Sequence, residues 1–197
     1  DNAGNEGFLE DGSVQWMTAG KGVVHSEMPK QTDGLVRGFQ LWLNLPKEKK
    51  MIEPAYHDIS ADQIPCIKTK ISSVKIISGE YQNTKGPGKP HTGFLYFDVN
   101  IDPGKSFSYD ILEDWNAFIY VYEGSLSVNS DLSKGFLGVL STSGKLEVSS
   151  LDRGASFILV AGEPLNEPVA RGGPFVMNTR SEILQAFEDY QSGKFGS

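Results

Sequence analysis

The sequence predicts an all-β protein that ends in one helix. Short runs in which apolar and polar residues alternate recur along most of the chain, and alternate residues of an extended strand share one face. The 22 glycines and 10 prolines among 197 residues supply the turns that many short strands need. Short strands at this spacing are typical of a β-sandwich or a β-barrel.

The first β-like block covers residues 12–45. Alternating runs predict strands at Val14–Met17, Gly22–Glu27 and Leu35–Asn44, with glycine-containing turns between them. The stretch from Pro54 to Lys70 has weak periodicity and contains two prolines. We interpret it as a linker between two blocks.

The second β-rich block starts near Ile71. Regular alternation predicts a strand at Leu95–Ile101, which ends in an Asp-Pro-Gly turn, and another at Phe118–Tyr122, which is followed by Glu123-Gly124 and then by Leu126 and Val128. Further strands are predicted at Phe136–Leu140, Leu146–Val148 and Ser156–Val160. This block has enough strands to close a barrel.

One helix is predicted near the C-terminus. Thr179 and Glu182 have the spacing of a capping box, in which each side chain bonds the backbone of the other residue. Ile183, Leu184, Phe187 and Tyr190 follow as an apolar stripe at helical spacing. The stripe predicts a helix that packs on the sheet and has no chemistry of its own.

The composition limits the kinds of partner. Eighteen basic and 25 acidic side chains give a net charge of −7, which argues against direct binding to nucleic acid. No apolar stretch has the length of a membrane-spanning helix, so no membrane partner is expected. A single cysteine, Cys66, cannot form an internal disulfide, and this favours a reducing compartment such as the cytosol or nucleus. The chain starts at Asp1 without methionine or signal peptide, so we expect it to begin within a longer protein.

His25 and Glu27 are the most informative pair of side chains. They lie two positions apart in a predicted strand, so both side chains point to the same side of it while that of Ser26 points to the other. An imidazole nitrogen and a carboxylate oxygen that converge in this way are half of a site for iron, manganese or zinc. A hydrogen-bonded pair without a metal is the structural alternative.

Several longer blocks resemble the pirin family, and together they span essentially the whole chain. These blocks are Val14–Gly20, His25–Pro29, Gln40–Leu45, Lys50–Pro54, Ala161–Pro164 and Gly173–Thr179. The resemblance implies tandem cupin β-barrels, the first of them N-terminally incomplete. It implies a first domain at residues 1–62, which carries the metal half-site, and a second at residues 63–197, which includes the helix and has no metal ligands.

The resemblance also implies a metal site. Pirins hold one metal, usually iron, with an HxH pair followed by an HxE pair, and only the HxE pair, His25 and Glu27, is present here. In the second barrel, the general cupin pattern places Asp110, Leu112 and Ala117 at ligand positions. Leucine and alanine cannot coordinate a metal, so this barrel is expected to be a scaffold or a docking surface.

Two functions follow from the resemblance. Pirins are described as nuclear cofactors of transcription factors, which predicts an iron-binding interaction module in the nucleus or cytoplasm with a transcription-regulator protein as its partner. Some are described as quercetin 2,3-dioxygenases, which predicts a metal-dependent oxidoreductase that takes a flavonol-type small molecule and uses Glu27 as a general base. Since the HxH pair is missing, we favour the interaction module and expect weak or absent enzyme activity.

Overall fold

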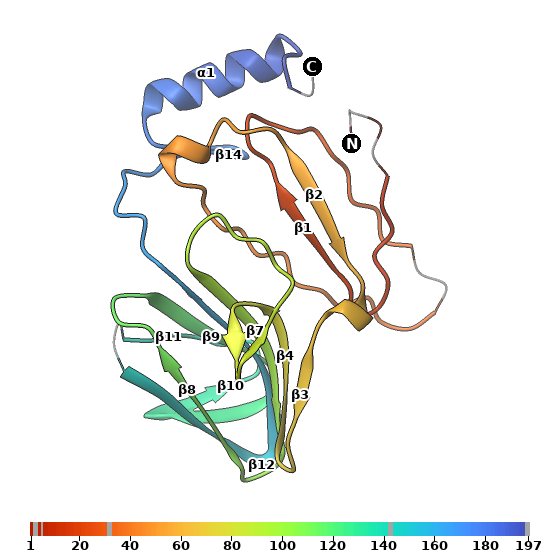
Figure 1. Ribbon diagram of the computed structural model, residues 1–197, viewed down its shortest axis with the longest axis vertical. Coiled ribbons are helices and arrows are strands. Elements are labelled where there is room, and N and C mark those ends of the chain that lie inside the picture. The colour runs from red at the N-terminus through yellow and green to blue at the C-terminus, as the bar shows by residue number, and fades with distance from the viewer. Residues whose placement is uncertain (2–3, 5, 31–32, 142–143, 196–197) are drawn as a thin grey trace. The chain divides into compact units, whose positions relative to one another are not determined.

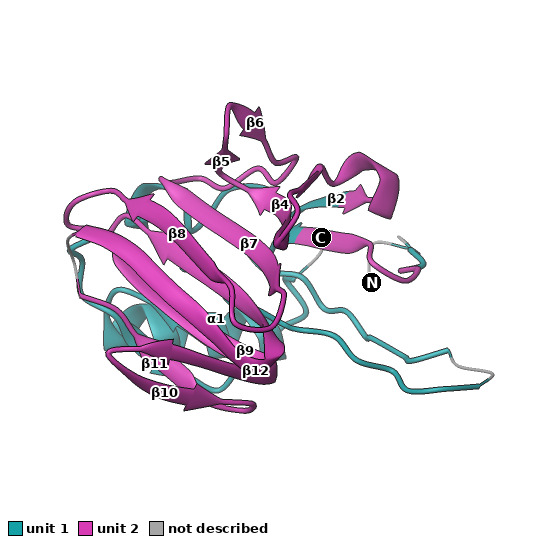
Figure 2. Ribbon diagram, turned by 90° about the horizontal axis from the view of Figure 1, so that it is seen from below, with its two compact units in different colours: residues 1–8, 17–57, 166–197 teal, residues 9–16, 58–165 magenta. Residues whose placement is uncertain are grey.

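The computed structural model describes residues 1, 4, 6–30, 33–141 and 144–195. It is mostly β-structure with one C-terminal helix, as the sequence predicts (Figure 1). Two compact units interleave along the chain: unit 1 contains residues 1–8, 17–57 and 166–197, and unit 2 contains residues 9–16 and 58–165 (Figure 2). The predicted domain boundary between residues 62 and 63 stays a prediction.

Unit 2 is built on an eight-stranded antiparallel sheet. Six strands follow one another in the order β10-β9-β12-β7-β4-β3, while β11 pairs with β9 and β8 pairs with β12. Their bounds are β3 Cys66–Lys68, β4 Ser72–Ser78, β7 Phe94–Ile101, β8 Ser106–Ile111, β9 Asn116–Val128, β10 Ser130–Ser133, β11 Leu137–Val139 and β12 Gly144–Gly162. Between β4 and β7 the chain forms a separate two-stranded hairpin of β5 (Glu80–Tyr81) and β6 (Thr84–Lys85).

The long strand β12 folds the sheet around its core. Its first part pairs with β8, and its second part pairs with β7 and β9 together. The register shifts between Ser150 and Ala155, where Gly154 has a φ of +74°. A bulge of this kind bends a strand, so one strand contributes to two parts of the curved sheet.

The core of unit 2 consists of the inward-facing side chains of these strands. Phe97, Phe157, Ile119 and Leu159 are fully buried in it. Two tyrosines pack against this cluster: Tyr109 meets Phe97 edge to face at a ring-centroid distance of 5.1 Å, and Tyr81 stacks on Phe107 at 5.9 Å. The alternation read from the sequence therefore reports the buried face correctly.

The interpretation of residues 54–70 as a linker is wrong. This stretch contains β2 (Ala55–Ile59), the short 3-10 helix Ala61–Gln63 and β3, and β2 pairs with β1 (Val14–Thr18). Ile59 and Ile64 are buried and pack with Ile77 in a second apolar cluster. The two prolines therefore lie between short ordered elements, and the stretch is not an exposed linker.

Two predicted strands are also corrected. The structure confirms β1, but it assigns no strand to Gly22–Glu27 or to Leu35–Asn44. A strand is defined by ladder hydrogen bonds to a neighbour, and alternation in a sequence cannot supply that neighbour. Figure 2 shows these residues as two extended arms that run side by side.

Unit 1 contains the C-terminal helix α1 (Arg180–Gln191), the hairpin β13 (Ala170–Gly172) and β14 (Phe175–Met177), and a 3-10 turn at Lys47–Lys49. The predicted capping box is confirmed, because Thr179 accepts the Glu182 N–H and Glu182 accepts the Thr179 N–H. Among the described residues, no helix combines the length and the apolar character that a membrane crossing requires.

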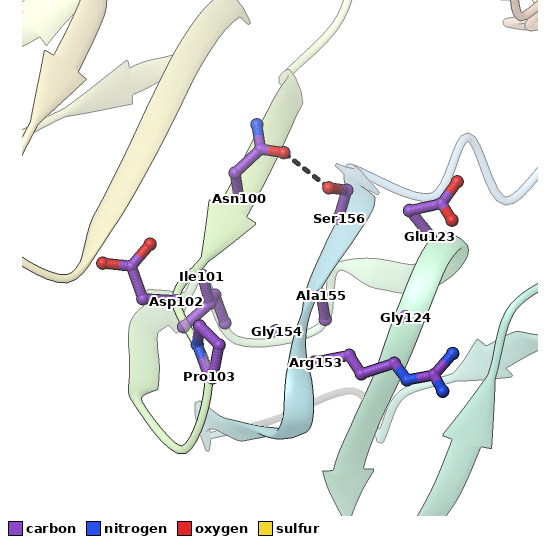
Figure 3. Close-up of a pocket in the computed structure, with 10 residues that line it drawn as sticks. All are labelled: Asn100, Ile101, Asp102, Pro103, Glu123, Gly124, Arg153, Gly154, Ala155 and Ser156. Atoms are coloured by element: carbon purple, nitrogen blue, oxygen red, sulfur yellow. Dashed lines mark hydrogen bonds between the residues drawn. The ribbon is translucent and has the colours of Figure 1, made fainter.

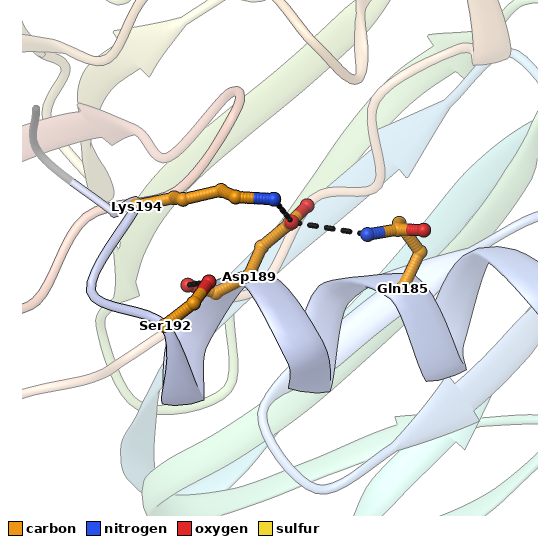
Figure 4. A network of polar contacts seen from close by, with 4 residues as sticks. All are labelled: Gln185, Asp189, Ser192 and Lys194. Carbon is orange, nitrogen blue, oxygen red and sulfur yellow. Dashed lines mark hydrogen bonds and ion pairs between the residues drawn. The ribbon is translucent and has the colours of Figure 1, made fainter.

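Two polar networks tie unit 1 together. Asp189 accepts hydrogen bonds from Gln185 at 3.0 Å and from Lys194 at 2.9 Å, which closes the end of α1 (Figure 4). Donation from Lys194 and Gln185 lowers the pKa of the Asp189 carboxyl group. In the other network, the buried Lys50 ammonium donates to Asn44 Oδ1 at 2.7 Å and to the Val176 carbonyl at 3.3 Å.

Candidate functional site

His25 and Glu27 lie in the first of the two extended arms of unit 1. Both side chains are exposed, and the segment is neither a regular strand nor a helix. We define the hairpin ribbon as residues 23–30 and 33–43, which form the two arms in Figure 2. Within it, the Gln40 amide donates to the Glu27 carboxylate, with Nε2 to Oε2 at 3.3 Å and to Oε1 at 3.5 Å.

Gln40 is the site residue that the sequence analysis missed. It comes from the second arm, 13 positions after Glu27, so spacing along one strand could not find it. A signal was present, since Asp33-Gly34 is a dipeptide typical of a hairpin turn. Pairing the arms about that turn brings Gln40 opposite Glu27.

The side chains at this site fall short of what a resident iron ion needs. Among the described residues, no group of three or more His, Cys, Asp or Glu side chains lies close enough together to hold a metal ion. His25 and Glu27 contribute two donors, and the Gln40 amide already bonds the carboxylate. Two protein donors leave most of the coordination sphere to water, so the residues present do not fit a resident iron site. The assignment of His25 and Glu27 as ligands stays a prediction.

The three cupin-motif positions in unit 2 do not converge. Asp110 and Leu112 are exposed, whereas Ala117 is buried. Aromatic side chains fill the interior of this sheet, with Phe97 and Phe157 fully buried. The described part of this unit is therefore built as a packed core.

An open hollow of about 250 Å³ lies at the bend of β12. Ser156 donates to Asn100 Oδ1 at 2.5 Å across it, and Gly124 and Gly154 line it (Figure 3). Asp102 and Arg153 point in opposite directions. Glu123, the third charged residue of the lining, is paired with Lys134 at 3.2 Å.

The curved antiparallel sheet of unit 2, packed around an apolar core, is the fold of a cupin-like protein. A solved quercetin 2,3-dioxygenase from Acinetobacter baumannii matches 99% of this chain and 70% of its own length, with a TM-score of 0.84 and 31% identity. A family model described as the pirin C-terminal cupin domain matches residues 96–196, and one described as pirin matches residues 1–43.

Curated relatives agree with these matches. A pirin-like protein of Caulobacter vibrioides is 44% identical over 198 residues, which cover 99% of this chain and 72% of that protein. Human pirin is 38% identical and is covered to 69% of its length, and a putative quercetin 2,3-dioxygenase of Pseudomonas aeruginosa is 39% identical and is covered to 71%. The chain belongs to the pirin family, and the resemblance read from its motifs is confirmed.

Proposed function

We propose that this chain is a pirin-like interaction module that binds a transcription-regulator protein in the nucleus or cytoplasm. The observation that supports this proposal is the small number of possible metal ligands. His25 and Glu27 are exposed on the hairpin ribbon, and among the described residues they do not belong to any group of three or more His, Cys, Asp or Glu side chains that could hold a metal ion. A ribbon that displays side chains to solvent suits recognition of a partner, whereas metal-dependent turnover of a flavonol needs an enclosed site with open metal positions. The relatives include both human pirin and a putative quercetin 2,3-dioxygenase, so the choice between the two functions rests on the donor set.

Iron has a secondary place in the proposal. With two protein donors, the affinity for iron(II) is expected to be weak and unselective. A bound ion would add charge beside Glu27 and so bias the conformation of the ribbon. We therefore propose that iron influences the module and that the module folds and binds without it.

The proposed function is tested by affinity capture from a nuclear extract, with the whole chain as bait, in the presence and absence of a chelator. The expected result is enrichment of a transcription regulator, with reduced retention when the chelator is present. A bait carrying Phe136→Ser, an exposed position in unit 2, is the matched control. No enriched regulator would contradict the module, and equal retention with and without chelator would remove iron from it.

Dioxygenase activity is expected to be negligible. The whole chain, supplied with iron(II) and quercetin, should consume no more oxygen than iron(II) alone, because two donors do not hold the metal against water. Oxygen uptake and loss of quercetin absorbance measure this directly. Turnover that disappears in His25→Ala would show that the pair supports catalysis and would reverse the preference for an interaction module.

A further inference from the structure

The β5–β6 hairpin covers one side of the core of unit 2 with a single aromatic ring. Tyr81, in β5, stacks on Phe107 at a ring-centroid distance of 5.9 Å and an interplanar angle of 28°. Its ring also lies 6.2 Å from that of Tyr109 and meets Phe97 edge to face at 6.0 Å. We call the space that Phe97, Phe107 and Tyr109 frame the aromatic slot. In the structure, the ring of Tyr81 occupies it.

Few specific contacts hold this hairpin against the sheet, and Figure 2 shows it at one margin of unit 2. Among the described residues, the Tyr109 hydroxyl donates the one hydrogen bond that joins residues 80–85 to the strands of the sheet, to the Glu80 carbonyl at 3.0 Å. The ion pair of Glu80 with Lys85, at 3.8 Å, stays within the hairpin. The closed position of the hairpin therefore depends chiefly on the Tyr81 ring.

The turn of the hairpin is strained, and glycines lie at its base. Gln82 and Asn83 form the turn with φ values of +47° and +62°, a left-handed conformation that costs free energy in residues other than glycine. Gly79 and Gly86 flank the two strands, and the Gly86 N–H donates to the Gly79 carbonyl at 2.9 Å. Small residues at the ends of a segment are common hinge positions. Strain at the turn and glycines at the base both favour movement of the hairpin as a unit.

We propose that the β5–β6 hairpin is a lid and that, when it lifts, the aromatic slot binds a planar, neutral ring that carries a hydroxyl group. The occupant takes the place of the Tyr81 ring and repeats its contacts. It stacks on Phe107 and presents its face to the edge of Phe97, both of which are geometries that aromatic pairs prefer. The inference concerns unit 2 alone and does not depend on the proposed function.

The polar groups around the slot determine the charge of its occupant. When the hairpin lifts, the Tyr109 hydroxyl loses the Glu80 carbonyl and donates to the oxygen of the occupant instead. Burial raises the pKa of Tyr109, and the negative charges of Glu80 and Asp110 raise it further, so this hydroxyl keeps its proton at neutral pH. The same two carboxylates disfavour an anion in the slot. A neutral phenol therefore fits better than a carboxylic acid.

The test uses p-cresol, which has the ring and hydroxyl group of a tyrosine side chain, titrated into the whole chain by isothermal titration calorimetry. Since the occupant competes with the lid, the apparent affinity falls with the fraction of chains that are open. Tyr81→Ala vacates the slot and should bind p-cresol roughly ten-fold tighter, or more, than the parent chain. The saturated analogue methylcyclohexanol cannot stack, and it should bind Tyr81→Ala several-fold more weakly than p-cresol does.

Asn83→Gly tests the lid without vacating the slot. Glycine at the second turn position relieves the left-handed strain and stabilises the closed hairpin, so the affinity for p-cresol should fall several-fold below that of the parent chain. Asn129→Gly is the matched control, because Asn129 has a φ of +57° in the turn between β9 and β10. It should leave the affinity unchanged.

Three results would overturn the inference. Equal affinities of the parent chain and Asn83→Gly, or binding by Tyr81→Ala without any by the parent chain, would mean that the hairpin does not lift. No binding by Tyr81→Ala with a parental circular dichroism spectrum would mean that there is no slot for a ring. Equal binding of p-cresol and methylcyclohexanol would mean that the space accepts any apolar molecule of that size.

Discussion

Phe97→Ala is expected to destabilise unit 2 by about 3–5 kcal/mol, the cost of removing a fully buried phenylalanine side chain. Phe97 has no exposed surface and lies in β7 at the centre of the core cluster. Its ring contacts Tyr109 at a centroid distance of 5.1 Å and Tyr81 at 6.0 Å. Truncation therefore leaves a cavity and removes two edge-to-face contacts, each with a geometry that aromatic pairs prefer.

Urea denaturation followed by circular dichroism measures this cost. The midpoint should fall while the slope with denaturant stays unchanged, which identifies a change of stability and not of the unfolded state. Phe136→Ala is the control, because its 63% exposed ring should cost less than about 1 kcal/mol. Equal costs for the two variants would mean that the aromatic interior of the sheet is not a packed core.

Strand prediction from the sequence succeeded where apolar residues alternate along the chain in the same way as buried side chains alternate in the structure. In β7, buried and half-buried residues alternate almost without interruption, so the alternation of apolar residues in Leu95–Ile101 reported it directly. It failed at Gly22–Glu27 and Leu35–Asn44, where the same alternation exists without a regular ladder. The period of a sequence tells which side chains share a face, but the partner strand is a long-range property.

The bend of β12 shows a second limit of strand prediction from the sequence. The sequence predicted Leu146–Val148 and Ser156–Val160 as separate strands, and the structure joins them in one strand of 19 residues. The residues between them carry the bulge, which interrupts the alternation without ending the strand. Chain-local patterns therefore find the two ends of such a strand and miss its continuity.

The sequence predicts only part of the candidate site, because contacts between distant parts of the chain are not visible in a local pattern. His25 and Glu27 are neighbours along one arm, so a short motif is enough to find them. Gln40 reaches Glu27 only because the chain turns between them. Recognising the Asp33-Gly34 turn would have paired the arms, since such dipeptides fix the register of a hairpin.

Gly124→Ala is the other substitution with a large expected effect, because it lies where β9 pairs with β12 beside the bulge. Gly124 has a φ of +68°, and a Cβ atom there would overlap the carbonyl oxygen of Gly154. The two backbones can approach this closely only without a side chain, so we expect a loss of about 3 kcal/mol or more from left-handed strain and displaced backbone together.

Gly104→Ala separates the two causes of that loss. Gly104 has nearly the same φ, +65°, but nothing lies within 4 Å of a Cβ added there. It should therefore cost only the strain of the left-handed conformation, about 1–2 kcal/mol. The difference between the two variants in urea denaturation measures the close approach of β9 to β12. Equal losses would contradict that close approach, and with it the bulge at which β12 bends.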